Sequence, residues 1–412
     1  MTSPPTGAGS ALGHVPGAPG DGAGRKPSST APAPRRPATG AELLLTVVLP
    51  GSGHVLRGSR GVGVLLAAGW ASLVALVVLR WERIGAWIVP PSPALDEGLA
   101  LAGAAILLLG IWAGSIYDLA VRSRRPPRPR SDSQWALAAR QLRGNRMAMA
   151  GLGVIGVLYL LALLTPLIAP FDPTTQGDVA ATRYLPPSGE HLMGTDRFGR
   201  DLFSRVLYGA RISLSIGFIA MGIAVTLGTL IGAIAGYVGG LLDGALMRFT
   251  DMMLSFPRLI LLIVIIALFD ASIFLVVVIL GLTGWMGVAR IIRGEVLSFR
   301  EREFVQAAVA LGLRDDRILF RHVIPNVLAP VIVFATLGIG NTILVEAGLS
   351  FLGLGVPPPT PTWGSIINEG RDALLTAWWV STFPGLAIVF TVVAFNLLGD
   401  GLRDALDPRQ RT

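Results

Sequence analysis

Apolar runs of about 20 residues recur along this chain, and they restrict it to folds that reside in a membrane. A helix rises about 1.5 Å per residue, so about 20 apolar residues cross the roughly 30 Å hydrocarbon core of a bilayer. Charged residues make up only 15% of the sequence, against about a quarter in a typical soluble protein. The sequence therefore predicts an all-α integral membrane protein. The runs of sufficient length are 61–80, 98–117, 147–169, 212–236, 245–268, 272–292, 326–348 and 382–400.

Changes in composition divide the chain into segments. The first segment is rich in Pro, Gly, Ala and Ser, which bury too little apolar surface to offset the entropy of ordering, so we expect disorder there. The first two apolar runs predict a hairpin, and a basic linker separates it from six core spans. The expected segments are a disordered cytoplasmic tail (1–40), an N-terminal transmembrane hairpin (41–120), a basic cytoplasmic linker (121–146), the first core span with an outer loop (147–210), a transmembrane domain containing a loop at 303–325 (211–402) and a cytoplasmic tail (403–412).

The placement of arginine orients these spans. Cytoplasmic loops of membrane proteins carry an excess of basic residues, and the stretch from Arg122 to Arg146 holds eight arginines. Six spans that start from a cytoplasmic linker put the loop 293–325 and both termini in the cytoplasm. The segments 171–211 and 349–381 then lie outside, although 171–211 carries five arginines of its own. Because the net charge of +8 gathers in such loops, it does not indicate a nucleic-acid partner.

The loop 303–325 reads EFVQAAVALGLRDDRILFRHVIP and is the most informative stretch of the chain. Helix formers fill 303–311, and Gly312 can close this helix in a left-handed cap. A second short helix is expected at about 315–323, and Pro325 suits the first turn of the next span. Small residues on the first helix would let another protein's backbone approach closely. The pattern predicts a helix pair lying at the cytoplasmic membrane face.

This loop resembles the cytoplasmic coupling loop in permease subunits of bacterial ABC importers. The resemblance is carried by Gln306, Ala307, Ala308, Gly312, His322, Ile324 and Pro325. It implies a type I importer permease core of six spans, preceded here by the hairpin, whose loop docks on a separate ATPase subunit and transmits its closing motion. Gln306 replaces the acid common in the family, and His322 stands where Ile is common, although the oligopeptide and dipeptide subfamily often tolerates His. Taken alone, the Ala-rich helix would suit an ordinary amphipathic connector.

Other stretches resemble the C subunit of oligopeptide and dipeptide importers. They include GTDRFGRDL at 194–202, LSFLGLG at 349–355 and NLLGDGLRDALDP at 396–408, and the resemblance covers about 138–409. It implies transport of di- or oligopeptides across a bacterial inner (plasma) membrane, with nickel or another small solute as the alternative. The implied partners are a second homologous permease subunit, two ATPase subunits that bind the ATP, an extracytoplasmic substrate-binding protein and the lipid bilayer.

Charged residues inside spans are expected to have a partner or a function, because ionisable groups are costly in a bilayer. Glu346, near the outer end of the fifth core span, is a candidate for lining the pathway or for contacting a partner subunit. Arg248 and Asp251 are three residues apart and are expected to pair. Residues 201–207 predict a short amphipathic helix at the outer interface, capped by Asp196 or Asp201. A structural role is favoured for that helix over substrate recognition.

Several kinds of chemistry find no support in the sequence. It has no cysteine, no Gly-x-x-x-x-Gly-Lys-Ser/Thr phosphate loop and no His-Glu-x-x-His motif, and its four histidines are scattered. We therefore expect neither an enzyme nor a chain with a cofactor, metal or ATP site of its own. A secondary transporter, the first rival, would show an inverted repeat with broken helices and buried ion ligands. A membrane enzyme, the second, would cluster polar residues at one depth. The hairpin has no assigned role.

Overall fold

The structure, a computed structural model, describes residues 59–80, 95–118, 134–269 and 271–407, together with short pieces between 39 and 56. Within these ranges the regular structure is helical, apart from one isolated bridge between Thr195 and Asp201. Most of the predicted tail 1–40, much of the basic linker and the end of the C-terminal tail lie outside the described residues.

Seven helical segments in the described part of the chain are long and apolar enough to cross a membrane. They agree with seven of the eight predicted spans, so the prediction of an all-α membrane protein is confirmed. Several run well beyond the predicted bounds. The segments are α3 (Arg60–Leu79), α5 (Leu95–Tyr117), α7 (Arg146–Ile168), α9 (Leu202–Val238), α12 (Ile273–Leu282) with α13 (Trp285–Arg300), α15 (Asp315–Ile318) running into α16 (Ile324–Phe351), and α18 (Trp379–Leu406).

The eighth predicted span, 245–268, is not one straight helix. It consists of α10 (Gly240–Leu254) and α11 (Arg258–Leu268), which meet at an angle of 81°. Pro257 lies at the corner, where it supplies no backbone N–H and disfavours helical geometry at the residue before it. The two helices together make either a broken span or a re-entrant segment, and α11 then packs against α12.

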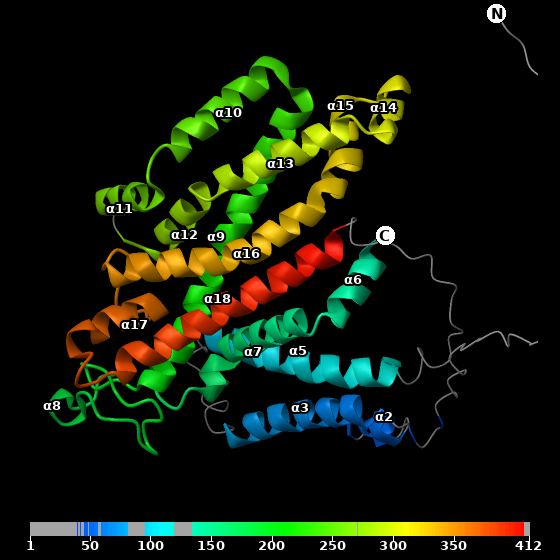
Figure 1. The fold of residues 1–412 in the computed structure, drawn as a ribbon. Helices are drawn as coiled ribbons and strands as arrows, with labels where there is room; N and C mark the ends of the chain where they lie inside the picture. Colours follow the sequence, from blue (N-terminus) through cyan, green and yellow to red (C-terminus); the bar gives the residue numbers. More distant parts are fainter. Residues whose placement is uncertain are drawn as a thin grey trace, which may run out of the picture.

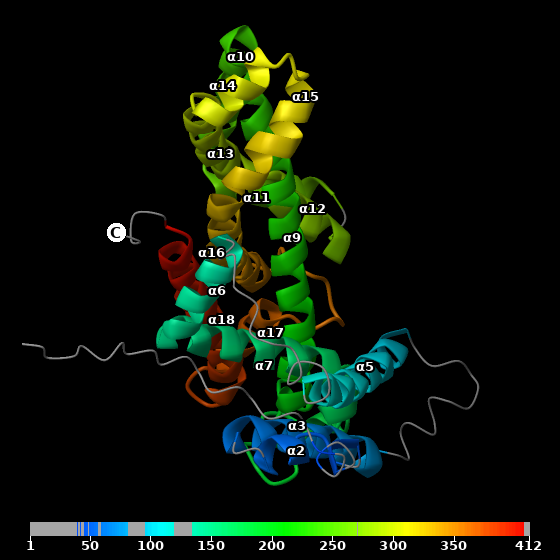
Figure 2. The same ribbon diagram turned by 90° about the vertical axis from the view of Figure 1, so that its right-hand side faces the viewer.

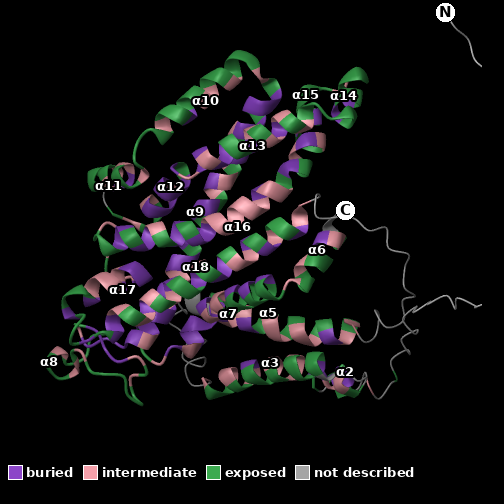
Figure 3. Ribbon diagram, viewed as in Figure 1, coloured by how far each residue is buried: buried purple, intermediate pink, exposed green. Residues whose placement is uncertain are grey.

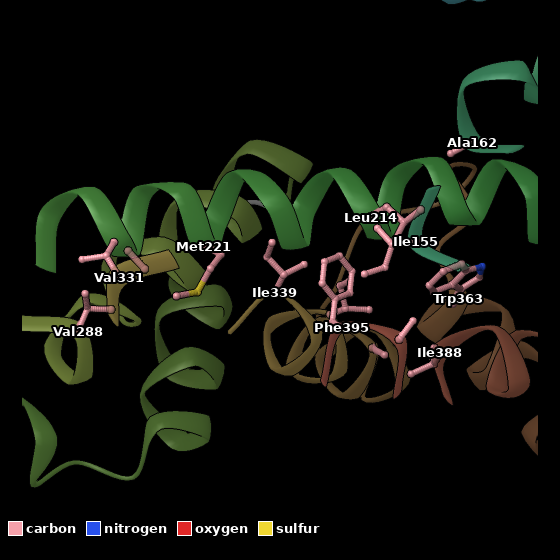
Figure 4. Packing of buried hydrophobic residues seen from close by; sticks show 14 of the residues in the cluster. Ile155, Ala162, Leu214, Met221, Val288, Val331, Ile339, Trp363, Ile388 and Phe395 are labelled. Atoms are coloured by element: carbon pink, nitrogen blue, oxygen red, sulfur yellow. The ribbon is translucent and has the colours of Figure 1, made fainter. Parts of the chain in front are cut away.

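The main apolar core surrounds α9. This helix packs against α13, α16, α12 and α7, and α16 in turn packs against α18. Figure 4 shows Leu214 and Met221 on α9 pointing toward Ile339 and Phe395 on the facing helices. Buried positions are concentrated on α9, α12 and the short helix α17 (Trp363–Gly370), whereas α3 and α5 are mostly exposed or half-buried (Figure 3). The exposed side chains of the long helices are largely apolar, as expected for surfaces that face lipid.

α9 is longer than the sequence analysis predicted. It runs without a break from Leu202 to Val238, so the expected separate interfacial helix at 201–207 does not exist. Leu202 and Val206 are instead buried in the main core. Asp201 accepts a hydrogen bond from the backbone N–H of Ser204 at 2.8 Å, which confirms it as the N-cap of the helix. At 37 residues, α9 is roughly 55 Å long and exceeds the thickness of a bilayer core.

The N-terminal hairpin packs against one helix of the core. α3 and α5 pack against each other, and both contact α7. Leu73 of α3 and Ala104 of α5 form a small cluster with Leu164 and Leu167 of α7. The guanidinium of Arg80, just after α3, donates to the backbone oxygen of Ile168 at 3.2 Å. α2 (Ser52–Leu56) packs on α3.

The bundle has two distinct ends (Figure 1). α8 (Val179–Thr182) and α17 lie together at one end, which we call the α17 end. α14 (Glu303–Ala310) and α15 lie at the opposite end, which we call the α14 end. α9 extends between them along most of the molecule (Figure 2). Residues far apart in sequence therefore meet at each end, and the sites described below are built there.

Candidate functional site: the loop between α13 and α16

The loop that carries the ABC-permease resemblance forms a compact turn. α14 ends at Ala310, and Gly312 adopts a φ of 71°, which L-residues with a side chain rarely tolerate. The backbone N–H of Leu313 then donates to the oxygen of Ala308 at 3.2 Å, which closes the helix end. A left-handed glycine at this position was predicted from the sequence, and the backbone geometry confirms it.

The second helix of the loop differs from its prediction. α15 continues through a π-helical turn (Leu319–Val323) directly into α16, so no separate helix ends before Pro325. Pro325 has no N–H to donate, and in a regular α-helix its ring would clash with the carbonyl of Arg321. The wider π turn just ahead of the proline accommodates this misfit. The second half of the loop is therefore an extension of α16, whereas α14 remains a separate short helix.

The seven residues that carry the resemblance do not all face outward. Gln306, Ala307, Gly312 and Pro325 are exposed, whereas Ala308 is buried in the main core. The remaining two, His322 and Ile324, are half-buried. Nothing lies within 4 Å of the position a Cβ would take at Gly312. The expected small-residue surface is therefore made by Ala307, Gly312 and Ala310, and Ala308 anchors α14 instead.

Large apolar side chains accompany these small residues on the surface. Leu311 is 80% exposed and Val309 is 51% exposed, beside the glycine turn. Phe304 at the start of α14 and Phe320 on the π turn are also exposed. Arginines surround the loop, and the Arg314 guanidinium pairs with the Asp316 carboxylate at 3.1 Å. Several exposed large apolar side chains near charged ones are typical of a protein interaction site.

Two polar contacts that the sequence did not reveal hold the loop to the bundle. The amide of Gln306 donates to the backbone oxygen of Arg300 at the end of α13 at 3.0 Å. The hydroxyl of Tyr237, one residue before the end of α9, donates to a carboxylate oxygen of Asp315 at 3.0 Å. A glutamate at position 306 could not donate the first of these bonds when ionised, so glutamine here has a structural consequence.

Glu346 is fully buried, at 0% exposure. Its carboxyl group accepts from the hydroxyls of Ser350 at 2.7 Å and Ser213 of α9 at 3.3 Å. Ser213 in turn accepts from the backbone N–H of Trp363 at 3.3 Å. Glu346 thus joins α16 to α9 and to the start of α17. It can line a pathway only if this packing opens, so its pathway role stays a prediction.

A cleft of about 860 Å³ opens beside the loop, between α13, α16 and α18. Its wall is mostly apolar, with aromatic side chains from α13 and α16. Acidic Glu295 and Asp407 and basic Arg302 and Arg403 add charges of both signs. The cleft lies at the α14 end, on the side of the molecule where the sequence places the cytoplasm.

At the α17 end, four charged side chains form a buried cluster. Asp196 is fully buried and pairs with Arg200 at 2.7 Å and with Arg205 of α9. Glu369 of α17 pairs with the same two arginines, at 2.6 Å to Arg200 and 3.0 Å to Arg205. Burial raises the pKa of Glu369 to about 7, against the opposing field of Arg200. The GTDRFGRD motif is thus a structural joint between the 171–201 segment, α9 and α17. This geometry supports the structural interpretation over substrate recognition.

Ion pairs at the α10 helix differ from the expected one. Asp251 pairs with Arg290 of α13 at 2.5 Å rather than with Arg248. Asp243 makes a two-pronged contact with Arg293, at 2.5 and 2.6 Å. The reason is tertiary, because α10 packs against α13 and meets its arginines there. Among the described residues, no group of three or more His, Asp or Glu side chains could hold a metal ion.

Comparison with known proteins identifies the family. Residues 228–412 match the binding-protein-dependent transport system inner membrane component, and residues 133–187 match the N-terminal transmembrane domain of oligopeptide transport permease C. A dipeptide transport system permease protein of Alkalihalophilus pseudofirmus is 43% identical over 284 residues, which cover 68% of this chain and 91% of that relative. An oligopeptide transport system permease protein of Bacillus subtilis is 39% identical over 282 residues, or 68% and 92% of the two chains.

A glutathione transport system permease protein of Escherichia coli O6:K15:H31 is also similar, at 42% identity over 275 residues, 67% of this chain and 90% of the relative. Neither family model extends into residues 1–132, where the hairpin lies. The relatives are matched over nearly their whole length, and the helical architecture agrees with a membrane permease. The chain therefore belongs to the family of inner membrane components of binding-protein-dependent transport systems, and it is a multi-pass ABC transporter permease subunit.

Proposed function

We propose that this permease carries di- or oligopeptides inward and that its α14–α15 loop docks on a separate ATPase subunit. The observation that carries the docking proposal is the exposed apolar surface formed by Phe304, Val309, Leu311 and Phe320 at the α14 end. Such a surface is unfavourable in water, and covering it with a partner removes that cost. Small residues at 307, 310 and 312 leave the backbone open to close approach.

Peptide transport is supported by the relatives, whose names specify dipeptide, oligopeptide or glutathione transport. The cleft between α13, α16 and α18 is a candidate for this chain's share of the pathway on the cytoplasmic side. Its apolar wall suits side chains of varied kind, and its charges of both signs suit the two charged termini of a free peptide. The complete importer would contain a second permease, two ATPase subunits that bind ATP and an extracytoplasmic binding protein.

The orientation proposed for the chain puts both termini and the α14 end in the cytoplasm. It is supported by the eight arginines of the linker and by the six arginines at 293, 300, 302, 314, 317 and 321 around the loop. The opposite end, with the buried charge cluster and α17, then faces outward, where a binding protein would deliver its peptide.

The docking proposal is tested at Gly312, whose φ of 71° excludes most side chains and whose surroundings are empty. The complex is purified through a tag on this chain, and the retained ATPase is quantified. Gly312→Trp places a bulky ring in the docking surface and is expected to release the ATPase. Gly312→Asn is the matched control, because asparagine tolerates left-handed geometry with a small side chain, and it should keep the ATPase bound. Retention by Gly312→Trp at the wild-type level would contradict docking through this loop.

Substrate class is tested in membrane vesicles that contain the whole complex. Peptide-loaded binding protein should stimulate ATP hydrolysis and drive uptake of labelled di- or oligopeptide. Stimulation by nickel or by another small solute, without any response to peptides, would overturn the peptide assignment and leave the permease assignment standing.

A further inference from the structure

Tyr237 joins two helices that meet at the α14 end. Its hydroxyl donates to Asp315 at 3.0 Å, and its ring is 8% exposed and packs in the main core. Asp315 begins the continuous helical segment that becomes α16. The bond therefore connects the end of α9 with the start of α16, directly beneath the exposed surface of α14.

The loop contacts the helices below it through Val305 and Ala308, which are buried in the main core, but part of α14 stands over a cavity. A cavity of about 300 Å³ separates α14 from the ends of α9 and α13, and it is bordered by Arg300, Gln306 and Val309 as well as by Tyr237 and Asp315. Dense packing would transmit any displacement of the loop to every neighbour. Besides this apolar packing, two polar contacts border the cavity, that of Gln306 with Arg300 and that of Tyr237 with Asp315. A hydrogen bond has a defined direction, so these two contacts join the loop to particular residues of α9 and α13.

α9 and α13 form a single stiff unit beyond that contact. A Cβ atom on Gly232 would lie 2.3 Å from the backbone oxygen of Ala289, and Cβ atoms at 228 and 236 would lie 2.5 and 2.8 Å from the nearest atoms of α13. Backbones in such contact cannot slide past each other without opening a gap. At its other end, α9 carries Ser213, which bonds to Glu346, and Arg205, which belongs to the buried charge cluster.

We propose that Tyr237 is a positioning residue through which displacement of the α14–α15 loop moves α9 and α13 as one body. This inference rests on the proposed docking of an ATPase at the loop. Closure of the ATPase displaces α15, the Tyr237–Asp315 bond moves the inner end of α9, and α9 carries the displacement to the α17 end. Gln306 holds α14 to α13 but does not reach α9, so Tyr237 supplies the link to the longest helix.

The test uses the complete complex reconstituted in proteoliposomes, with two readouts measured together. The first is peptide taken up per ATP hydrolysed, and the second is the amount of ATPase retained. Tyr237→Phe keeps the buried ring and removes only the hydroxyl. It is expected to lower the peptide-to-ATP ratio roughly 3- to 10-fold, the effect of losing one hydrogen bond from the coupling step. ATPase retention and ATP hydrolysis without substrate should stay at wild-type levels.

Two further variants make the result specific. Tyr159→Phe is the matched control. The Tyr159 hydroxyl also donates to α9, at the backbone oxygen of Leu214 (3.5 Å), but it lies away from the loop. The peptide-to-ATP ratio of this variant should change less than about 2-fold. Asp315→Asn keeps a side-chain oxygen that can accept the bond, so it should preserve coupling, whereas Asp315→Ala should match Tyr237→Phe. The double variant Tyr237→Phe/Asp315→Ala should be no worse than either single change.

A wild-type ratio in Tyr237→Phe, or additive losses in the double variant, would overturn the role of Tyr237 while leaving the importer assignment intact. If no ATPase is retained by the wild-type chain, the proposed function itself fails, before any variant is compared. A defect in Tyr159→Phe as large as that in Tyr237→Phe would also overturn the inference, because it would show a general sensitivity of α9.

Discussion

The two ends of this permease are built by different means. At the α17 end, Asp196, Arg200, Arg205 and Glu369 pair with one another inside the protein, and removing one member of such a network leaves an uncompensated buried charge. At the α14 end, apolar side chains are left in contact with solvent, and polar contacts bridge a cavity beneath them. The charges at one end are satisfied within the chain, whereas the other end exposes the apolar side chains on which the proposed docking depends.

The largest effect is expected from breaking the internally satisfied end. Arg205→Met keeps most of the side-chain volume but leaves Asp196 and Glu369 with one arginine between them. We expect a loss of about 3–5 kcal/mol in the free energy of unfolding, measured by denaturation of the purified chain in detergent. Arg197→Met is the control, because Arg197 is exposed on the same loop, and it should change stability by less than about 0.5 kcal/mol. If Arg205→Met and Arg197→Met lowered the free energy of unfolding equally, the buried cluster would stabilise the fold no more than an exposed arginine does.

A change of pH should act on the same end with a smaller effect. The pKa of Glu369 is raised from 4.5 to about 7 by burial. A carboxyl group whose folded-state pKa lies above its unfolded value stabilises the fold fully below about pH 4.5, and this contribution is lost as the pH rises through about 7. The chain should therefore be less stable at pH 8 than at pH 5, by about 1–3 kcal/mol.

The contribution of Glu369 is isolated by repeating the pH series with Glu369→Gln, which has no proton to exchange. Every other side chain is the same in that variant, so the difference between the two curves is assigned to Glu369. The wild-type melting temperature should fall more steeply from pH 5 to pH 8 than that of the variant. Parallel curves would show that the carboxyl group titrates in its ordinary range.

Substitutions at the α14 end should weaken binding of the ATPase and leave the stability of the isolated chain nearly unchanged. Leu311→Ser removes a side chain that is 80% exposed, so the isolated chain should keep its stability within about 0.5 kcal/mol. Docking should weaken by roughly 10-fold, because a buried leucine contributes about 1.5–3 kcal/mol and this contact covers only part of it. Leu375→Ser is the matched control, since Leu375 is 100% exposed at the α17 end. If Leu311→Ser and Leu375→Ser lowered ATPase retention equally, the proposed difference between the two ends would be contradicted.

Much of this architecture follows from the sequence because a bilayer allows few solutions. Long apolar runs must be helical where lipid surrounds them, so hydropathy located seven of the spans directly. Gly312 and Asp201 were predictable because a left-handed cap and an N-cap depend on local backbone chemistry. The bend at Pro257 also has a local signal, because a proline inside an apolar run disfavours a continuous helix.

The remaining features depend on contacts between distant segments. α9 extends past its hydropathy window because Arg205 is neutralised by Asp196 and Glu369, which belong to other segments. Asp251 pairs with Arg290, 39 residues away, where local spacing favoured Arg248. Tyr237 and Asp315 are 78 residues apart, and nothing in either segment signals the other. A single sequence gives the propensity of each helix but not the partner that each charge will meet.

The N-terminal hairpin packs on α7, and its position limits which faces of the chain can contact another membrane subunit. α3 and α5 cover one flank of α7 through Leu73, Ala104, Leu164 and Leu167. No second membrane subunit can occupy that flank while the hairpin is there. The pairing with a second permease proposed above would thereby be confined to the rest of the perimeter, so a segment outside the matched family models would narrow the lateral geometries of the complex.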